Sequence, residues 1–423
     1  MLHTLSNKQS KAILGWFLIA LFFCYQYLLR VIPGVISDEL RHAFYMTAED
    51  FSSLGSYSLY AYSFLQIPIG FIVDRIGIKR SVLFSLFLCI LGTFWLTQTH
   101  SLFAAQMSRV LVGAGSASAF MGAIKWVADH FEPGRRGTLM GATLVMGTFG
   151  ALGAGHPLVM SVEAFGWKQS ILLTCILGVF LVIFIALFLK DSQKKSSIHF
   201  DMRQLKKDLK TIACNKTIVI YALLAIGVYT PLAVLADLWG VSFLMQKFHI
   251  TRADAASTTM LMYLGLAIGS LTLPAFAERY RLFTRVIQIC SLGLLALFSG
   301  MLMAHTLSML ALKGIFLLIG CLCGAEMICF SGALIGSEKR TSGLTIGFVN
   351  TMNMLGGAVL QQLIGTALDW QWNGAVDPAG VRLYTMEHYV WALMILPIVL
   401  VACVLLSMTL KKKDFDGYVK GAH

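Results

Sequence analysis

A charged turn between two apolar segments decides the fold. It reads Gly70-Phe-Ile-Val-Asp74-Arg75-Ile-Gly77-Ile-Lys79-Arg80, and it joins apolar stretches at 51–73 and 81–98. Each stretch is close to the roughly 20 residues that cross a bilayer as a helix. Gly70 permits close helix packing and Gly77 supplies the turn. Lys79 and Arg80 anchor the cytoplasmic side. Asp74 ends its helix, where the dipole disfavours an anion, so it needs an outside partner unless the turn is simply solvated.

The composition extends this reading to the whole chain. Of 423 residues, 57% are apolar and 13% are charged, with mean hydropathy +0.75. Soluble domains carry about 25% charged residues, so lipid must be the solvent here. The net charge of +12 lies in short clusters between apolar runs, a pattern that orients membrane proteins and does not indicate nucleic-acid binding. The nine cysteines fall in or at the ends of apolar segments, so we expect neither disulfides nor a metal site.

The apolar segments predict an all-α membrane protein of twelve transmembrane helices. We expect them at 12–36, 51–73, 81–98, 102–129, 138–160, 169–189, 217–246, 255–277, 286–304, 308–335, 342–367 and 389–410. A polar linker, 190–216, separates an N-terminal half, 12–189, from a C-terminal half, 217–410. Tails at 1–11 and 411–423 complete the chain. The first apolar run lacks a small-residue cleavage site, so we expect a retained helix and not a signal peptide.

Basic residues predict the orientation. With the N-terminus inside, the loops that face outward hold few of them: Arg41, Lys168, Lys247, Arg252 and Arg382. Most others, including Lys411 to Lys413, fall on the inner side. This asymmetry predicts that both termini are cytoplasmic, in a bacterial inner membrane.

The two halves repeat each other. Gly113-Ala-Gly-Ser aligns with Gly320-Cys-Leu-Cys, and Asp74-Arg75 has an echo in Glu278-Arg279. A further set of glycines aligns in pairs: Gly137 with Gly343, Gly141 with Gly347 and Gly150 with Gly356. Repeated halves are typical of transporters whose site lies between the repeats at mid-membrane.

The turn at 70–80 resembles the GxxxDRxGxKR signature of the major facilitator superfamily at every defining position. The resemblance covers nearly the whole chain and implies transport by alternating access. It implies that the partner of Asp74 is the start of the eleventh helix, across the interface between halves, where the contact closes the cytoplasmic gate. Arg109-Val-Leu-Val-Gly113-Ala-Gly115 resembles a second family signature.

Finer features separate subfamilies. Gly147-Thr-Phe-Gly150-Ala151 has alanine where drug antiporters carry proline, which argues against multidrug efflux. Three stretches are similar to a bacterial subfamily of phagosomal-type nutrient and siderophore transporters, distantly related to lysosomal dipeptide transporters. They are Leu65-Gln-Ile-Pro-Ile-Gly70, Leu238-Trp-Gly-Val241 and Gly347-Phe-Val-Asn350.

Charged groups inside a span are costly unless they face a cavity or a partner. Gln26 and Arg30 lie one turn apart and suit a carboxylate or phosphate, although Arg30 is also near enough to the outer side to snorkel. Lys125 either lines the cavity or pairs with Asp129, one turn further on. We expect Arg109 to be structural or part of coupling.

Two carboxyl groups are candidates for proton coupling. Glu326 lies near the middle of the tenth helix, where a buried carboxyl can exchange protons near neutral pH. Asp237 on the seventh helix is the second candidate. Asn350 and Asn353 share a face of the eleventh helix and are candidates for solute binding. For each of these four, an interhelical hydrogen bond that only holds the bundle is the competing interpretation.

These features predict a monomeric secondary transporter in a lipid bilayer that imports a small organic solute together with protons. The positive charges of the N-terminal half favour a solute with a carboxylate or phosphate: an amino acid, small peptide, nucleoside or siderophore. The alternatives are an exporter and, less favoured, a membrane-embedded enzyme or a sensor. The sequence has no GxxxxGK[ST] loop for ATP, and we expect no enzymatic activity and no cofactor.

Overall fold

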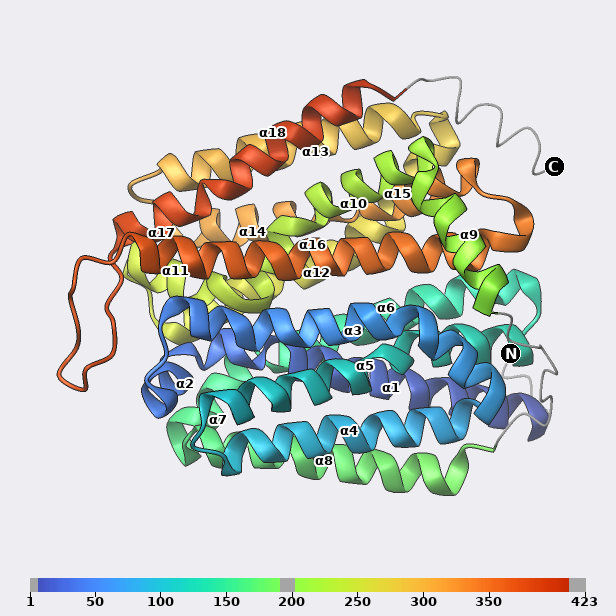
Figure 1. Ribbon diagram of the computed structural model, residues 1–423, viewed down its shortest axis with the longest axis horizontal. Coiled ribbons are helices and arrows are strands. Elements are labelled where there is room, and N and C mark those ends of the chain that lie inside the picture. Colours follow the sequence, from blue (N-terminus) through green and yellow to red (C-terminus); the bar gives the residue numbers. More distant parts are fainter. Residues whose placement is uncertain (1–6, 191–201, 411–423) are drawn as a thin grey trace.

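The computed structural model describes residues 7–190 and 202–410, which form a bundle of helices (Figure 1). The first half contains α1 (Asn7–Val35), α2 (Ser37–Phe44), α3 (Ala48–Ile76), α4 (Ile78–Gln98), α5 (Leu102–His130), α6 (Pro133–Gly153), α7 (His156–Phe165) and α8 (Trp167–Phe188). The second contains α9 (Met202–Cys214), α10 (Lys216–Val234), α11 (Gly240–Phe248), α12 (Arg252–Tyr280), α13 (Phe283–Met303), α14 (Met309–Cys323), α15 (Glu326–Ala333), α16 (Ser342–Trp370), α17 (Met386–Leu393) and α18 (Ile395–Met408). Three short turns complete it: the π-helical η1 (Leu235–Trp239) and the 3-10 turns η2 (Leu334–Gly336) and η3 (Lys339–Thr341).

The helices confirm an all-α membrane protein. In the described part of the chain, 11 helical segments are long and apolar enough to cross a membrane. The twelfth member of the bundle is α3, which is richer in serine and tyrosine and packs between α5 and α16. Its polar side chains fit this position, because much of its surface faces other helices and not lipid.

Four of the expected spans are interrupted. The segment 138–160 breaks between α6 and α7, and 217–246 passes through η1. The segment 308–335 breaks between α14 and α15, and 389–410 breaks between α17 and α18. Hydropathy does not register such breaks, because the chain stays apolar through them. Two of them position site residues.

Glycine packing reproduces the internal repeat. A Cβ atom at Gly113 would lie 2.0 Å from the carbonyl oxygen of Ser58, and one at Gly320 would lie 2.0 Å from that of Met262. The fourth and tenth predicted spans therefore press backbone to backbone on the second and eighth. A Cβ at Gly150 would lie 1.9 Å from the Cys24 carbonyl oxygen, and one at Gly356 would lie 2.4 Å from the Ile226 side chain.

The two ends of the bundle differ (Figure 1). At one end, α1 begins, α18 ends and α9 crosses the bundle; we call this the termini end. The other end, which we call the loop end, contains α2, α17 and the segment 371–385. This segment folds back on itself, and an antiparallel bridge joins Val376 to Arg382. Part of the expected polar linker is the helix α9, which Arg340 holds by two bonds to Asp208.

Candidate functional site

A buried ion pair joins the two halves at the middle of the bundle. Arg30 on α1 donates from Nε and Nη2 to Oδ2 of Asp237, at 2.8 and 2.6 Å. The Asp237 side chain is 3% exposed and that of Arg30 is 11% exposed. A pair this deep depends on both partners, because either charge left alone would be strongly destabilised.

Backbone geometry places these two groups face to face. Asp237 lies in η1, a wide turn of a kind often found at functional sites. One turn beyond Arg30, Gly34 packs on this turn, and a Cβ there would lie 2.9 Å from the Asp237 carbonyl oxygen. Since only glycine allows that approach, α1 and η1 are held close enough for the side chains to pair.

Tyrosines surround the pair. The Tyr263 hydroxyl of α12 donates to Oδ1 of Asp237, and Arg30 donates to the Tyr229 hydroxyl of α10 at 2.9 Å. The guanidinium also lies 5.7 Å from the centre of the Tyr27 ring and 3.7 Å from the Met354 sulfur of α16. The network therefore connects α1 of the first half to three spans of the second.

A second polar pair lies nearby in the C-terminal half. Asn353 of α16 donates to Oε2 of Glu326 at 2.9 Å, and the two side chains belong to residues 1% and 5% exposed. Glu326 begins α15, after the break at Gly324. A Cβ at Gly324 would lie 2.3 Å from the Gly269 backbone, so the break lies directly on α12. The side-chain oxygen of Asn353 is buried and has no hydrogen-bond partner among the described residues, so the group has spare acceptor capacity.

Arg109 has a different environment. It is buried in the N-terminal half and donates to the carbonyl oxygens of Leu54 and Leu29, each at 3.1 Å. These bonds tie α5 to α3 and α1 within one half. The arrangement favours the structural interpretation of this residue over a role as ligand.

The other candidates for solute binding lie around the interface. Gln26 is buried on α1, one turn before Arg30. Asn350 on α16 approaches the Tyr62 hydroxyl of α3, across the two halves. Lys125 is partly buried nearer the termini end of α5, with Asp129 one turn further on. The structure thus pairs four of the candidates, Arg30 with Asp237 and Asn353 with Glu326. The binding roles of all the candidates stay predictions.

The charged turn behaves as a packed helix junction. Gly77 has φ of 93°, in the left-handed region that favours glycine, and joins α3 to α4. Lys79 donates to the Ala186 carbonyl oxygen of α8 at 2.6 Å, whereas Arg75 and Arg80 are exposed. Gly70 faces Met121 of α5, 3.7 Å from the position of a Cβ. The Asp74 side chain lies outside the described part of the structure, so its partner across the halves stays a prediction.

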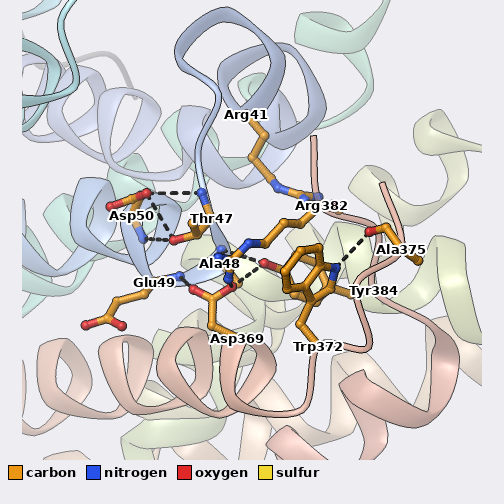
Figure 2. A network of polar contacts seen from close by, with 10 residues as sticks. All are labelled: Arg41, Thr47, Ala48, Glu49, Asp50, Asp369, Trp372, Ala375, Arg382 and Tyr384. Carbon is orange, nitrogen blue, oxygen red and sulfur yellow. Dashed lines mark hydrogen bonds and ion pairs between the residues drawn. The ribbon is translucent and has the colours of Figure 1, made fainter. Parts of the chain in front are cut away.

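At the loop end, polar contacts bind one half to the other (Figure 2). Asp369, near the end of α16, accepts from the backbone N–H groups of Ala48 and Glu49 at 3.2 and 2.8 Å. It also accepts from Arg382 at 3.0 Å and from the Tyr384 hydroxyl. Further cross-half pairs are Arg252 with Glu39, and His42 with Asp377 at 2.5 Å. This end of the bundle is closed.

The termini end lacks this close packing at three repeat glycines. A Cβ at Gly137, Gly343 or Gly347 would meet no atom within 4 Å. These residues belong to α6 and α16, one helix from each half. In the described part of the structure, polar contacts thus join the halves at the loop end, and open space lies beside these three glycines toward the termini end, where a Cβ at Gly141 would still lie 3.1 Å from the Leu271 side chain of α12.

Sequence reasoning missed several members of the site. Tyr229, Tyr263 and Met354 were not among its candidates. Tyrosine is common in membrane helices, and only its position relative to Asp237 reveals a role. Asp369 was missed because a carboxylate at a helix end is usually solvated. A possible signal was the position of Tyr229, eight residues before Asp237 on the same predicted span.

Comparisons with known proteins agree with this architecture. The family model of the Major Facilitator Superfamily matches residues 16–360. An uncharacterized transporter, YybO, of Bacillus subtilis is 26% identical over 40% of this chain and 39% of its own length. A nitrite extrusion protein of the same organism is 23% identical over 50% of this chain and 51% of its own length. The matched region thus spans about two fifths to a half of these relatives.

Two solved structures share the fold. An inward-facing, unoccupied bacterial homolog of the human lysosomal transporter Spinster has a TM-score of 0.75 at 13% identity, covering 98% of both chains. The nucleoside transporter NupG also has a TM-score of 0.75, at 15% identity, covering 94% of this chain and 99% of its own.

Proposed function

Because the chain belongs to the Major Facilitator Superfamily, we propose that it is a secondary transporter that imports a small anionic solute together with protons. The observation that carries this proposal is the buried Arg30–Asp237 pair between the halves. Alternating access requires the halves to move against each other. A charged pair on their interface is therefore affected both by binding of the solute and by the relative position of the halves.

The pair suggests how a proton and an anion enter together. Arg30 makes two of its hydrogen bonds to one oxygen of Asp237. When Asp237 takes up a proton, its carboxyl no longer balances the guanidinium, and a carboxylate or phosphate of the solute replaces it. Arginine binds such groups through parallel N–H donors. Binding of the anion then favours the protonated form of Asp237, which is the thermodynamic requirement for symport.

Glu326 supplies a second proton site. Its carboxyl lies beside Asn353 on α16, the helix that carries Met354 toward Arg30. Protonation at Glu326 changes the bonding of α16, which also contacts the N-terminal half through α3. In this proposal Asp237 governs solute binding, and Glu326 governs the return of the empty carrier. Gln26, Lys125 and Asn350 line the path of the solute.

The test is uptake into proteoliposomes made with the purified protein. Labelled carboxylates and their neutral amides are presented as matched pairs, with and without a pH gradient that is acidic outside. We expect accumulation of carboxylates only with the gradient, and its loss on adding a protonophore. Equal uptake of acid and amide would overturn charge selection, and accumulation without a gradient would overturn proton coupling. Extrusion in place of uptake would identify an exporter.

A further inference from the structure

At the loop end, a carboxylate of one half caps a helix of the other. The first N–H groups of any helix have no partner within it, and its N-terminus carries partial positive charge. In α3 the first two of these groups belong to Ala48 and Glu49, and both donate to Asp369 of α16. The N–H group of Ala48 is shared with the Tyr384 hydroxyl, at 2.9 Å. Thr47 and Asp50 add a local capping box, so the start of α3 is well defined without Asp369. The carboxylate from the second half is therefore an additional bond.

Asp369 is held by more than this helix end. Four donors reach its two oxygens: two backbone N–H groups, the Arg382 guanidinium and the Tyr384 hydroxyl (Figure 2). The Arg382 guanidinium lies 4.2 Å from the centre of the Trp372 ring, and that of Arg41 lies 5.0 Å from the centre of the Tyr384 ring. The segment 371–385 thus brings its own donors to the same carboxylate.

Glycine packing shows that α3 and α16 are in close contact on either side of this cap. A Cβ at Gly365, one turn before Asp369, would lie 2.6 Å from the Ala48 carbonyl oxygen. A Cβ at Gly55 on α3 would lie 2.5 Å from the amide oxygen of Gln361. At the other end of α16, a Cβ at Gly343 or Gly347 would meet none of the described atoms within 4 Å. The cap is therefore made where α3 and α16 touch.

We infer that Asp369 is the gate residue of the loop end, and that opening of the bundle on this side requires its release from α3. The inference rests on the proposed function in one respect, that the protein alternates between two states. Release from α3 breaks the two backbone N–H bonds of Ala48 and Glu49 together, whereas Arg382 and Tyr384 belong to the same half as Asp369 and hold its carboxylate in place to receive α3 again. Asp369 is a positioning residue, because it acts through the two helices and has no contact with the central pair.

The experiment is hydrogen–deuterium exchange of the purified full chain, read by mass spectrometry in peptides from both ends. Asp369→Asn places an NH2 group against donors and removes the charge. We expect several-fold faster exchange at 45–56, and slower exchange at 134–142 and 342–348, because loss of the loop-end gate shifts the population toward closure of the termini end. Glu387→Gln, which neutralises an exposed carboxylate at the same end, is the matched control and should change neither region.

The far end decides the test. Faster exchange at 45–56 with no change at 134–142 would overturn the inference, since a local cap accounts for that result. If Asp369→Asn does not fold, Tyr384→Phe removes one donor and should shift both ends in the same senses by a smaller factor. Absence of that shift would also overturn the inference. Asp74→Asn, at the opposite end of α3, should give the reverse pattern. If the variants shift exchange as expected but the wild-type protein transports no solute, the proposed function is refuted and the inference about Asp369 still stands.

Discussion

The helix α16 packs tightly on α3 at the loop end, and it has open space beside two of its glycines toward the termini end. At the loop end, Gly55 and Gly365 let the backbones approach, and Asp369 bonds across the gap. Toward the termini end, a Cβ at Gly343 or Gly347 of α16 would meet no atom of the described residues within 4 Å. Along α16, tight packing at the loop end thus gives way to open space beside the two glycines toward the termini end.

The contrast indicates which contacts differ in energy between the two conformations. A contact made at only one end changes between states, whereas a contact at the middle is available to both. The Arg30–Asp237 pair lies at the middle, and the loop-end bonds lie at one side. Variants at the centre should therefore damage both states, and variants at the ends should shift the balance between them.

The largest effect is expected at the centre. Asp237→Asn leaves the Arg30 guanidinium buried without a countercharge, and removal of one partner of a buried pair costs about 3–5 kcal/mol. We expect a much lower unfolding temperature and no transport, measured by thermal unfolding and by uptake. An added carboxylate that fits the site should restore more stability to the variant than to the wild type, because it replaces the lost charge.

The paired change separates charge balance from packing. Arg30→Gln together with Asp237→Asn removes both charges, so its loss of stability should be smaller than the sum of the single losses. If the two single losses add, the residues do not depend on each other and the central pair is not the switch.

The next effect concerns coupling. Glu326→Gln mimics the permanently protonated carboxyl and keeps an acceptor for Asn353. We expect it to abolish accumulation driven by a pH gradient and to preserve exchange of labelled for unlabelled solute, since exchange needs no release of the proton. Continued accumulation by the variant would show that Glu326 is not the coupling site, and Asp237 alone would then carry the proton.

The fold was largely accessible from sequence. Apolar segments, the charged turn and the aligned glycines predicted the membrane helices and the family, because each reflects a local rule of length or packing. The interruptions were not accessible. The break at Gly324 depends on the backbone of α12, and the widened turn at Asp237 depends on contacts that no local pattern records.

From the sequence, members of the site could be identified only one by one and not as contacting pairs. Arg30 and Asp237 each stood out, because a charge in a membrane span demands an explanation. Their pairing did not, since they are 207 positions apart and meet only through the packing of the halves. Asp369 gave no signal at all, because a carboxylate at a helix end is ordinary until the partner helix is known.

A smaller effect should separate the two ends of α16. Gly365→Ala adds a methyl group 2.6 Å from the Ala48 carbonyl oxygen, and such overpacking costs about 1–3 kcal/mol. Gly343→Ala adds the same group where no atom lies within 4 Å. We expect Gly365→Ala to lower the unfolding temperature and speed exchange at the loop end, and Gly343→Ala to change neither. Equal effects of the two substitutions would contradict the contrast between the ends.

The smallest effect concerns His42, which connects α2 to the segment 371–385. Its Nδ1 lies 2.7 Å from the Asp38 carbonyl oxygen, and its Nε2 lies 2.5 Å from the Asp377 carboxylate. Both partners are acceptors, so only the protonated ring can donate to both. The bond to the Asp38 carbonyl, followed by that to Asp377, raises the pKa of His42 above its ordinary value of 6.5. Backbone N–H donors, that of Val381 first, and His42 itself lower the pKa of Asp377.

The signs of these shifts fix the pH dependence. A raised folded-state pKa means that the contribution of His42 to closure is complete below pH 6.5 and is lost as pH rises through the folded-state value. The contribution of Asp377 persists as pH falls, until its lowered pKa is reached. We therefore expect exchange at the loop end to slow from pH 8 to pH 5, after correction for the intrinsic pH dependence of exchange. His42→Gln, which keeps one donor but cannot titrate, should flatten that change. The other charged groups around the ring are Asp38, Glu39, Arg41, Arg252 and Arg382, and none of them is a histidine. A pH dependence that survives in His42→Gln would therefore assign the closure to groups other than this pair.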